Sequence, residues 1–288
     1  MSARQPQNAV VVGVDGGVAA NQALDAAVAE AERSGRPLHI LHATRMGTLP
    51  WNPERIGAHE QIALGCYERA KRANPALSIT YDTQIEGPAA ALVTASHTAS
   101  LIVLGPASYG RAASTVLGAT SHQVAAHSRC PVMVTPQSGR WSSRGPVVVG
   151  VDAAEHSVQA IAYAFAAAST RHTDLVAVHT WWRDEAGPFL PGSGSEEEWT
   201  QVAQNQKLIL AEMLAGWQDK YPEVRVTPTS VRGQAAVVLE QVSADGQLLV
   251  VGSRGRGGFT GLLLGSVSSR VLHRARCLAV VVPSTKRH

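Results

Sequence analysis

A group of small residues near the C-terminus has types and spacing suited to holding a phosphate. Gly252, Gly255, Gly265 and Ser266 follow the pattern Gly-x2-Gly-x9-Gly-Ser. Glycine lets a ligand approach the backbone closely, and the free N–H groups at a helix start favour an anion. The Ser266 hydroxyl adds a hydrogen-bond donor. The spacing is neither the dinucleotide-binding Gly-x-Gly-x-x-Gly nor a P-loop, because Gly258 stands where a P-loop needs lysine.

Asp152 supplies a second kind of chemistry. It directly follows the apolar run Val147–Val151, and an acidic group at such a strand end suits ribose hydroxyls in other dinucleotide-binding folds. Together with the glycine pattern it predicts a nucleotide site. The alternative is that the glycines only form turns and helix caps. Arg254 and Arg256 either contact phosphate or are solvated loop residues.

Patterns for metal binding or covalent catalysis are missing from the sequence. The histidines show neither His-x-x-x-His nor His-Glu-x-x-His spacing, and no Gly-x-Ser-x-Gly motif is present. We therefore predict no metal ligands and no catalytic residues. His42 and His179 occupy equivalent strand ends, where a hydrogen-bonded structural histidine is the favoured interpretation over a catalytic base.

The elements that must position these residues occur twice along the chain. Residues 10–17 and 147–154 are near copies, and residues 101–111 recur at 248–258. Two copies of this size predict two like domains rather than a solenoid. The expected organisation is a first domain at 1–138 with a degenerate nucleotide motif, a linker at 139–146 rich in Pro, Gly and Ser, and a second domain at 147–288 with an intact motif.

Each copy alternates apolar strand-like runs with helical periodicity, which predicts a parallel sheet with helices on both faces. The expected strands are Val10–Val14, Leu38–Ala43, Ser78–Ile85, Leu101–Leu104 and Val132–Thr135, then Val147–Val151, Leu175–His179, Arg225–Val231, Leu248–Val251 and Leu278–Val282. Helices are expected near 89–99, 118–128, 235–244 and 265–275, and a stripe of Trp199, Val202, Ile209, Met213 and Trp217 predicts another.

The fold class that follows is α/β, with two tandem doubly wound domains. Each is expected to hold a five-stranded parallel sheet of order 3-2-1-4-5. Ligands of such sheets bind beyond the carboxyl ends of the strands, where the winding direction reverses. That order makes strands one and four neighbours, so Asp152 and Gly252 are expected to share one crevice.

The whole chain resembles a tandem universal stress protein, a family with Gly-x2-Gly-x9-Gly-[Ser/Thr] and an aspartate after strand one. Many members bind ATP, so the resemblance implies ATP as the cofactor, with or without Mg. It also implies that the backbone at Gly150 and Val151, and Thr180 after the strand-two histidine, line a nucleoside pocket. The implied second-domain site comprises Gly150, Val151, Asp152, Thr180, Gly252, Ser253, Arg254, Gly255, Arg256, Gly257, Gly258, Gly265, Ser266 and Val267.

The first copy departs from this pattern. Its motif runs Gly105-x2-Ser108-x9-Gly118-Ala119, with a Cβ at the second glycine position and no final hydroxyl. We therefore expect the first site to be weaker or empty. Its candidate residues are Gly13, Asp15, Ala43, Gly105, Ser108 and Gly118.

Composition narrows the remaining functional classes. A net charge of +3, from 25 basic and 22 acidic residues, is too mild to indicate nucleic acid or an anionic membrane as partner. No apolar run approaches the length of a membrane helix. Cys66, Cys130 and Cys277 are few and odd in number, which fits a reducing compartment and predicts a cytoplasmic protein without disulfides.

The leading interpretation is a nucleotide-binding regulatory module whose ATP occupancy shifts a conformational or assembly equilibrium. A stress-response role and a homodimer are implied by the resemblance. The alternatives left open are a slow ATPase or nucleotidyl transferase on the same fold, with at most weak hydrolysis, and a scaffold that binds no nucleotide.

Overall fold

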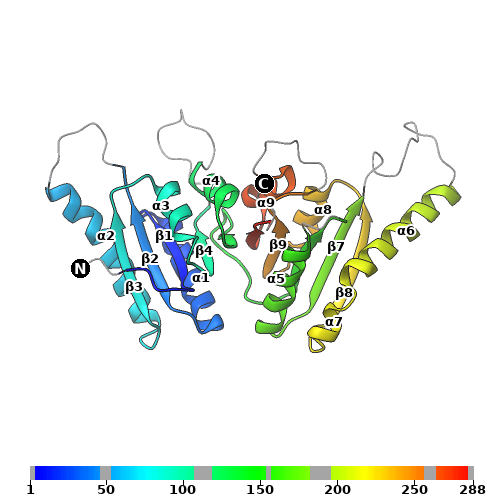
Figure 1. Ribbon diagram of the computed structural model, residues 1–288, viewed down its shortest axis with the longest axis horizontal. Helices are drawn as coiled ribbons and strands as arrows, with labels where there is room; N and C mark the ends of the chain where they lie inside the picture. The colour runs from blue at the N-terminus through cyan, green and yellow to red at the C-terminus, as the bar shows by residue number, and fades with distance from the viewer. Residues whose placement is uncertain are drawn as a thin grey trace. The chain divides into compact units, whose positions relative to one another are not determined.

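The protein forms two compact units, Met1–Arg140 and Trp141–His288. The computed structural model describes residues 4–45, 53–106, 119–153, 157–181, 196–255 and 264–284. Figure 1 shows strands and helices alternating along both units. Among the described residues, no helix is both long enough and apolar enough to cross a lipid bilayer.

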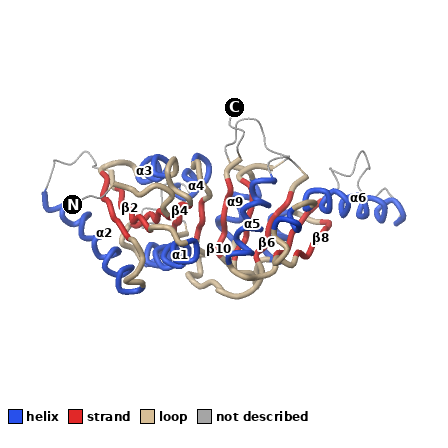
Figure 2. Tube along the Cα trace, turned by 60° about the horizontal axis from the view of Figure 1, so that its bottom comes forward, coloured by secondary structure: helices blue, strands red, loops and turns tan. Residues whose placement is uncertain are grey.

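The first unit is a parallel sheet of strand order β3-β2-β1-β4-β5. Its elements are β1 (Val10–Val14), α1 (Val18–Ser34), β2 (Leu38–Ala43), α2 (Pro53–Ala73), β3 (Ile79–Gln84), α3 (Pro88–Ala95), β4 (Leu101–Leu104), α4 (Ala119–His127) and β5 (Val132–Val134). Figure 2 shows α1 and α2 on one side of the strands and α3 and α4 on the other. The predicted order 3-2-1-4-5 is therefore confirmed for this unit.

The second unit repeats the arrangement, with strand order β8-β7-β6-β9-β10. Its elements are β6 (Val147–Val151), α5 (Ser157–Thr170), β7 (Leu175–Trp181), α6 (Glu196–Leu214), α7 (Trp217–Lys220), β8 (Val226–Arg232), α8 (Ala235–Val242), β9 (Leu248–Gly252), α9 (Ser266–Arg274) and β10 (Leu278–Val282). The first strand of this unit, β6, lies between β7 and β9, which is where the winding direction reverses. The expected doubly wound α/β class is thus confirmed in both units.

The central strands are apolar because helices cover both of their faces. In β6 every valine is at most 5% exposed. Gly150 interrupts the run because α8 packs there, and a Cβ at this position would lie 2.9 Å from Leu239 Cδ1. Gly13 in β1 is constrained in the same way, by Leu104 at 2.8 Å and Leu92 at 3.1 Å. Leucine side chains of α3, β4 and α8 therefore leave little room for a Cβ at these two positions.

The helices differ in places from the sequence expectation. α2 has 21 residues in a stretch for which no helix was predicted. The stripe ending at Trp217 is split, because α6 ends at Leu214 and Gly216 adopts a left-handed φ of 76° before α7 begins. The most buried side chains of α6 are Leu210 and Leu214, beside the stripe rather than on it.

Candidate functional site

The glycine loop after β9 meets the carboxylate that follows β6. β6 and β9 pair in parallel from Val147 with Leu248. Continuing this register places Asp152 level with the residue after Gly252. A Cβ on Gly255 would lie only 2.6 Å from Oδ2 of Asp152, so the loop backbone passes directly against the carboxylate. The structure therefore brings together the two groups that were expected to share one crevice.

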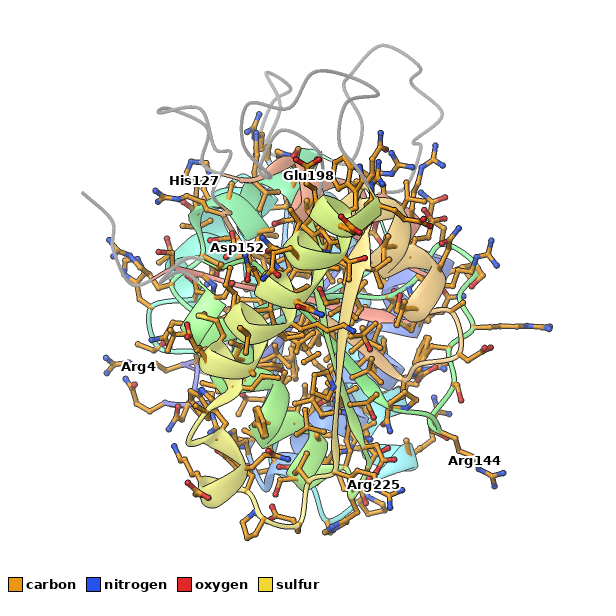
Figure 3. All side chains as sticks on the ribbon, turned by 90° about the vertical axis from the view of Figure 1, so that its right-hand side faces the viewer. Arg4, His127, Arg144, Asp152, Glu198 and Arg225 are labelled. Atoms are coloured by element: carbon orange, nitrogen blue, oxygen red, sulfur yellow. The ribbon has the colours of Figure 1, made fainter. Side chains whose placement is uncertain are left out.

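Asp152 lies at the carboxyl end of the second unit's strands. Figure 3 shows Asp152 and Glu198 toward one end of this unit and Arg225, which precedes β8, at the other. Ser157, the first residue of α5, holds Asp152 through two hydrogen bonds. The backbone N–H of Asp152 donates to Ser157 Oγ at 2.9 Å, and the Ser157 hydroxyl donates to Oδ1 of Asp152. The carboxylate is thus held by α5 on one oxygen and bordered by the glycine loop on the other.

Ser157 was not among the residues singled out from the sequence. It is only 4% exposed, and its hydroxyl both accepts from and donates to Asp152. The signal that was available is the Asp-x4-Ser spacing at the start of a helix. That spacing alone also fits an ordinary serine near a helix N-terminus, so only the fold identifies its partner.

Hydrogen bonds tie the glycine loop to the start of α9 and to the end of β10. The Gly265 N–H donates to the carbonyl of Ser253 at 2.8 Å, and the Ser268 hydroxyl donates to the carbonyl of Gly252 at 2.6 Å. The Ser253 N–H in turn donates to the carbonyl of Val282 at 2.8 Å. The start of α9 is therefore fixed beside the end of β9.

The N-terminus of α9 starts at a glycine and has no side-chain cap. Gly265 is the N-cap, with φ −70° and ψ 158°, and no side chain caps the helix. A Cβ on Gly265 would meet its nearest atoms at 3.5 Å or beyond, so internal packing does not require glycine there. Ser266 is exposed, and Val267 is half-buried. The first N–H groups of the helix and its dipole form an anion-binding surface.

Thr180 and Arg254 border the same end of the sheet. Thr180 lies in β7 opposite Val231 and is half-buried. Arg254 follows Ser253 in the glycine loop, and its Nε is buried with no hydrogen-bond partner in the described part of the chain. The predicted site residues Arg256, Gly257 and Gly258, and Ser108 and Gly118 of the first copy, lie outside the described residues.

The two equivalent histidines make the same structural contact. Nδ1 of His179 lies 2.8 Å from the carbonyl of Val151, and its Nε2 lies 2.7 Å from Oε1 of Gln206 in α6. Nδ1 of His42 lies 2.7 Å from the carbonyl of Val14. Both rings are buried. These contacts link each first strand to its neighbour and fit the structural role expected for both histidines.

The first unit uses its equivalent residues differently. Asp15 is exposed, and its Oδ1 accepts the N–H of Gly17 at 2.9 Å, next to the start of α1. A Cβ on Gly105 would lie 2.9 Å from the carbonyl oxygen of Ala19, so packing against α1 already requires glycine there. Ala43 ends β2. Packing against α1 therefore accounts for Gly105, and the Asp15 carboxylate contacts the backbone at the start of α1.

The cysteine thiols are buried, and burial makes them poor nucleophiles. All are free thiols, and burial raises the pKa of Cys130 and of Cys277 to about 11. Near neutral pH these thiols remain protonated, and the protonated form is a poor nucleophile. Within the described residues, no group of at least three His, Cys, Asp or Glu side chains is arranged to hold a metal ion.

The chain is similar to known proteins in both sequence and fold. The model of the universal stress protein family matches residues 8–136 and 144–283. A universal stress protein of Mycobacterium tuberculosis (strain H37Rv) is 37% identical over 98% of this chain and 99% of its own length. One from Mycolicibacterium smegmatis is 34% identical over 95% and 96%. A universal stress protein structure from Archaeoglobus fulgidus has a similar fold, with a TM-score of 0.69 at 16% identity over 97% of this chain and 99% of that one.

Proposed function

The chain belongs to the universal stress protein family in its tandem two-domain form, and from this premise we propose that it is a cytoplasmic ATP-binding regulatory module. The second unit is the one that holds the nucleotide. Occupancy by ATP shifts a conformational or assembly equilibrium of the protein. The family also leads us to propose a homodimer that acts in a stress response.

The observation that carries this proposal is the meeting of Asp152 with the glycine loop at the point where the sheet reverses its winding. A parallel sheet binds its ligand at that point. Gly255 lies against the Asp152 carboxylate, and Gly265 begins α9 without a side-chain cap. In the proposed complex, Asp152 accepts hydrogen bonds from ribose hydroxyls. The amides of Ser266 and Val267 face the phosphates.

The charge of the site supports a phosphate ligand. The start of α9 carries the positive end of the helix dipole. Arg254 adds a guanidinium whose buried Nε has no hydrogen-bond partner within the described ranges. A triphosphate provides anionic oxygens that suit both groups. ATP therefore fits the residues present, and Mg enters the proposal only as a companion of the triphosphate.

The first unit is proposed to bind nucleotide weakly or not at all. Ser108, which stands where the second copy has Gly255, carries a Cβ. Ala119, which stands where the second copy has Ser266, has no hydroxyl. Losing a hydrogen bond to a charged group costs about 1.5–3 kcal/mol, or roughly tenfold to a hundredfold in affinity. The expected occupancy is thus one nucleotide per chain.

Denaturing freshly purified protein and counting the released nucleotide by chromatography tests the proposal. We expect one ATP for each chain, because only the second unit keeps the full motif. Two ATP molecules would show that the substitutions in the first unit are tolerated. If no nucleotide is released and calorimetry detects no ATP binding, the proposed function is wrong. Recovery of ADP in place of ATP would favour the slow ATPase.

A further inference from the structure

The contact between Ser157 and Asp152 has a geometry suited to fixing the carboxylate. The Ser157 hydroxyl donates to Oδ1 of Asp152 and accepts the Asp152 backbone N–H at 2.9 Å. One hydroxyl therefore bridges the backbone and the side chain of the same aspartate. Ser157 begins α5 and is only 4% exposed, whereas Asp152 is half-buried.

The first unit has no hydroxyl at the position equivalent to Ser157. Asp15 and Asp152 are 137 residues apart, and the residue 137 positions before Ser157 is Ala20. Ala20 is 5% exposed and cannot donate a hydrogen bond. Oδ1 of Asp15 instead accepts the N–H of Gly17. Both carboxylates are thus bonded to the start of the helix that follows them, Asp15 by an exposed backbone N–H and Asp152 by a buried hydroxyl.

We propose that Ser157 is a positioning residue that sets the second unit's preference for a ribose with free hydroxyl groups. The inference deepens the proposed function, and it rests on ATP binding at this site. Ser157 does not touch the nucleotide. It acts through Asp152 by holding the carboxylate against the glycine loop, where Oδ2 faces Gly255.

The physical basis is preorganisation of the carboxylate. A carboxylate held by fewer hydrogen bonds samples more side-chain rotamers and must be ordered when the ligand binds. A hydroxyl that already holds one carboxylate oxygen removes that cost before binding. Ordering one side chain accounts for roughly a twofold to tenfold change in affinity. The gain applies only to ligands that bond to the carboxylate, so it appears as discrimination between sugars.

Calorimetry of the full-length protein with ATP and with 2′,3′-dideoxy-ATP, which lacks both ribose hydroxyls, tests the inference. The wild type should bind ATP about tenfold or more tightly than the dideoxy nucleotide. In Ser157→Ala we expect ATP binding to weaken about threefold to tenfold while dideoxy-ATP binding stays unchanged. The ratio of the two dissociation constants should therefore shrink. Ser157→Thr keeps the hydroxyl and should restore the ratio.

A matched control lies on the same helix. Ser169, in the last turn of α5, also donates to a carboxylate, that of Glu223, and Ser169→Ala should leave both dissociation constants unchanged. Thermal unfolding of each variant reports on folding separately. A ratio unaltered in Ser157→Ala, or an equal loss for both nucleotides, would overturn the inference and leave ATP binding intact. If the wild type bound no ATP, the proposed function would fail, and the inference would fail with it.

Discussion

In Gly255→Ala, ATP binding at the second unit is expected to weaken by at least about tenfold, and by up to about a hundredfold, with little change in the free energy of unfolding. The added Cβ would lie 2.6 Å from Oδ2 of Asp152. The carboxylate is the end of a side chain, so it can move away without disturbing the backbone. That movement breaks its bond to Ser157 and takes it away from the proposed ribose position. The loss therefore falls on binding.

Calorimetric titration with ATP and urea unfolding, both on the full-length protein, measure the two quantities. Gly65→Ala is a suitable control, because Gly65 is exposed in the interior of α2 and a Cβ there would meet nothing within 4 Å. This control should keep the ATP affinity and add about 0.5–1 kcal/mol of stability, since alanine favours a helix more than glycine does. Wild-type affinity in Gly255→Ala would show that the loop and the carboxylate do not act together.

Phe165→Ala is expected to destabilise the second unit by about 3–5 kcal/mol. Phe165 lies in the middle of α5 and is fully buried. Its ring stacks on Trp217 and on Tyr221, each with centroids 5.7 Å apart, so it joins α5 to α7 and to the turn after it. Removing the ring leaves a cavity between elements that cannot close without moving α7.

Urea unfolding followed by circular dichroism measures this loss. Two units can unfold in separate transitions, so the curves need a three-state fit, and only the second unit's transition should shift. Val158→Ala on the same helix is the control, because Val158 is 41% exposed and surface changes usually stay within about 0.5 kcal/mol. A loss below about 1 kcal/mol in Phe165→Ala would contradict the packing described here.

Much of the fold could be predicted because its strands are buried on both faces. The bounds expected for β1, β6 and β10 are those observed, since a continuous apolar run flanked by turn residues leaves few alternatives. The strand order then follows from the rules for parallel sheets. The order in turn brings Asp152 beside Gly255, although the two are far apart in the sequence.

The other features of the fold and of the candidate site depend on contacts between distant segments, which the local sequence does not encode. The pattern cannot show that Gly105 is required by the carbonyl of Ala19, whereas Gly265 is free of internal neighbours closer than 3.5 Å. It also cannot show that Ser157 bonds to Asp152 rather than capping its own helix. The break at Gly216 is similar, because the apolar stripe continues through it. Each of these features is decided by packing between distant segments.

The glycines described here fall into two groups, and this division bears on how duplicated domains diverge. Substituting Gly13 or Gly105 would disturb packing in the first unit, and that copy keeps both. Where the second copy has Gly255 and Ser266, the first has Ser108 and Ala119. Under the proposed function, substitutions at such positions remove the ligand of a domain and leave its fold intact. In this proposal, one half of a duplicated protein loses its binding role but keeps its fold, while the other half still binds the ligand.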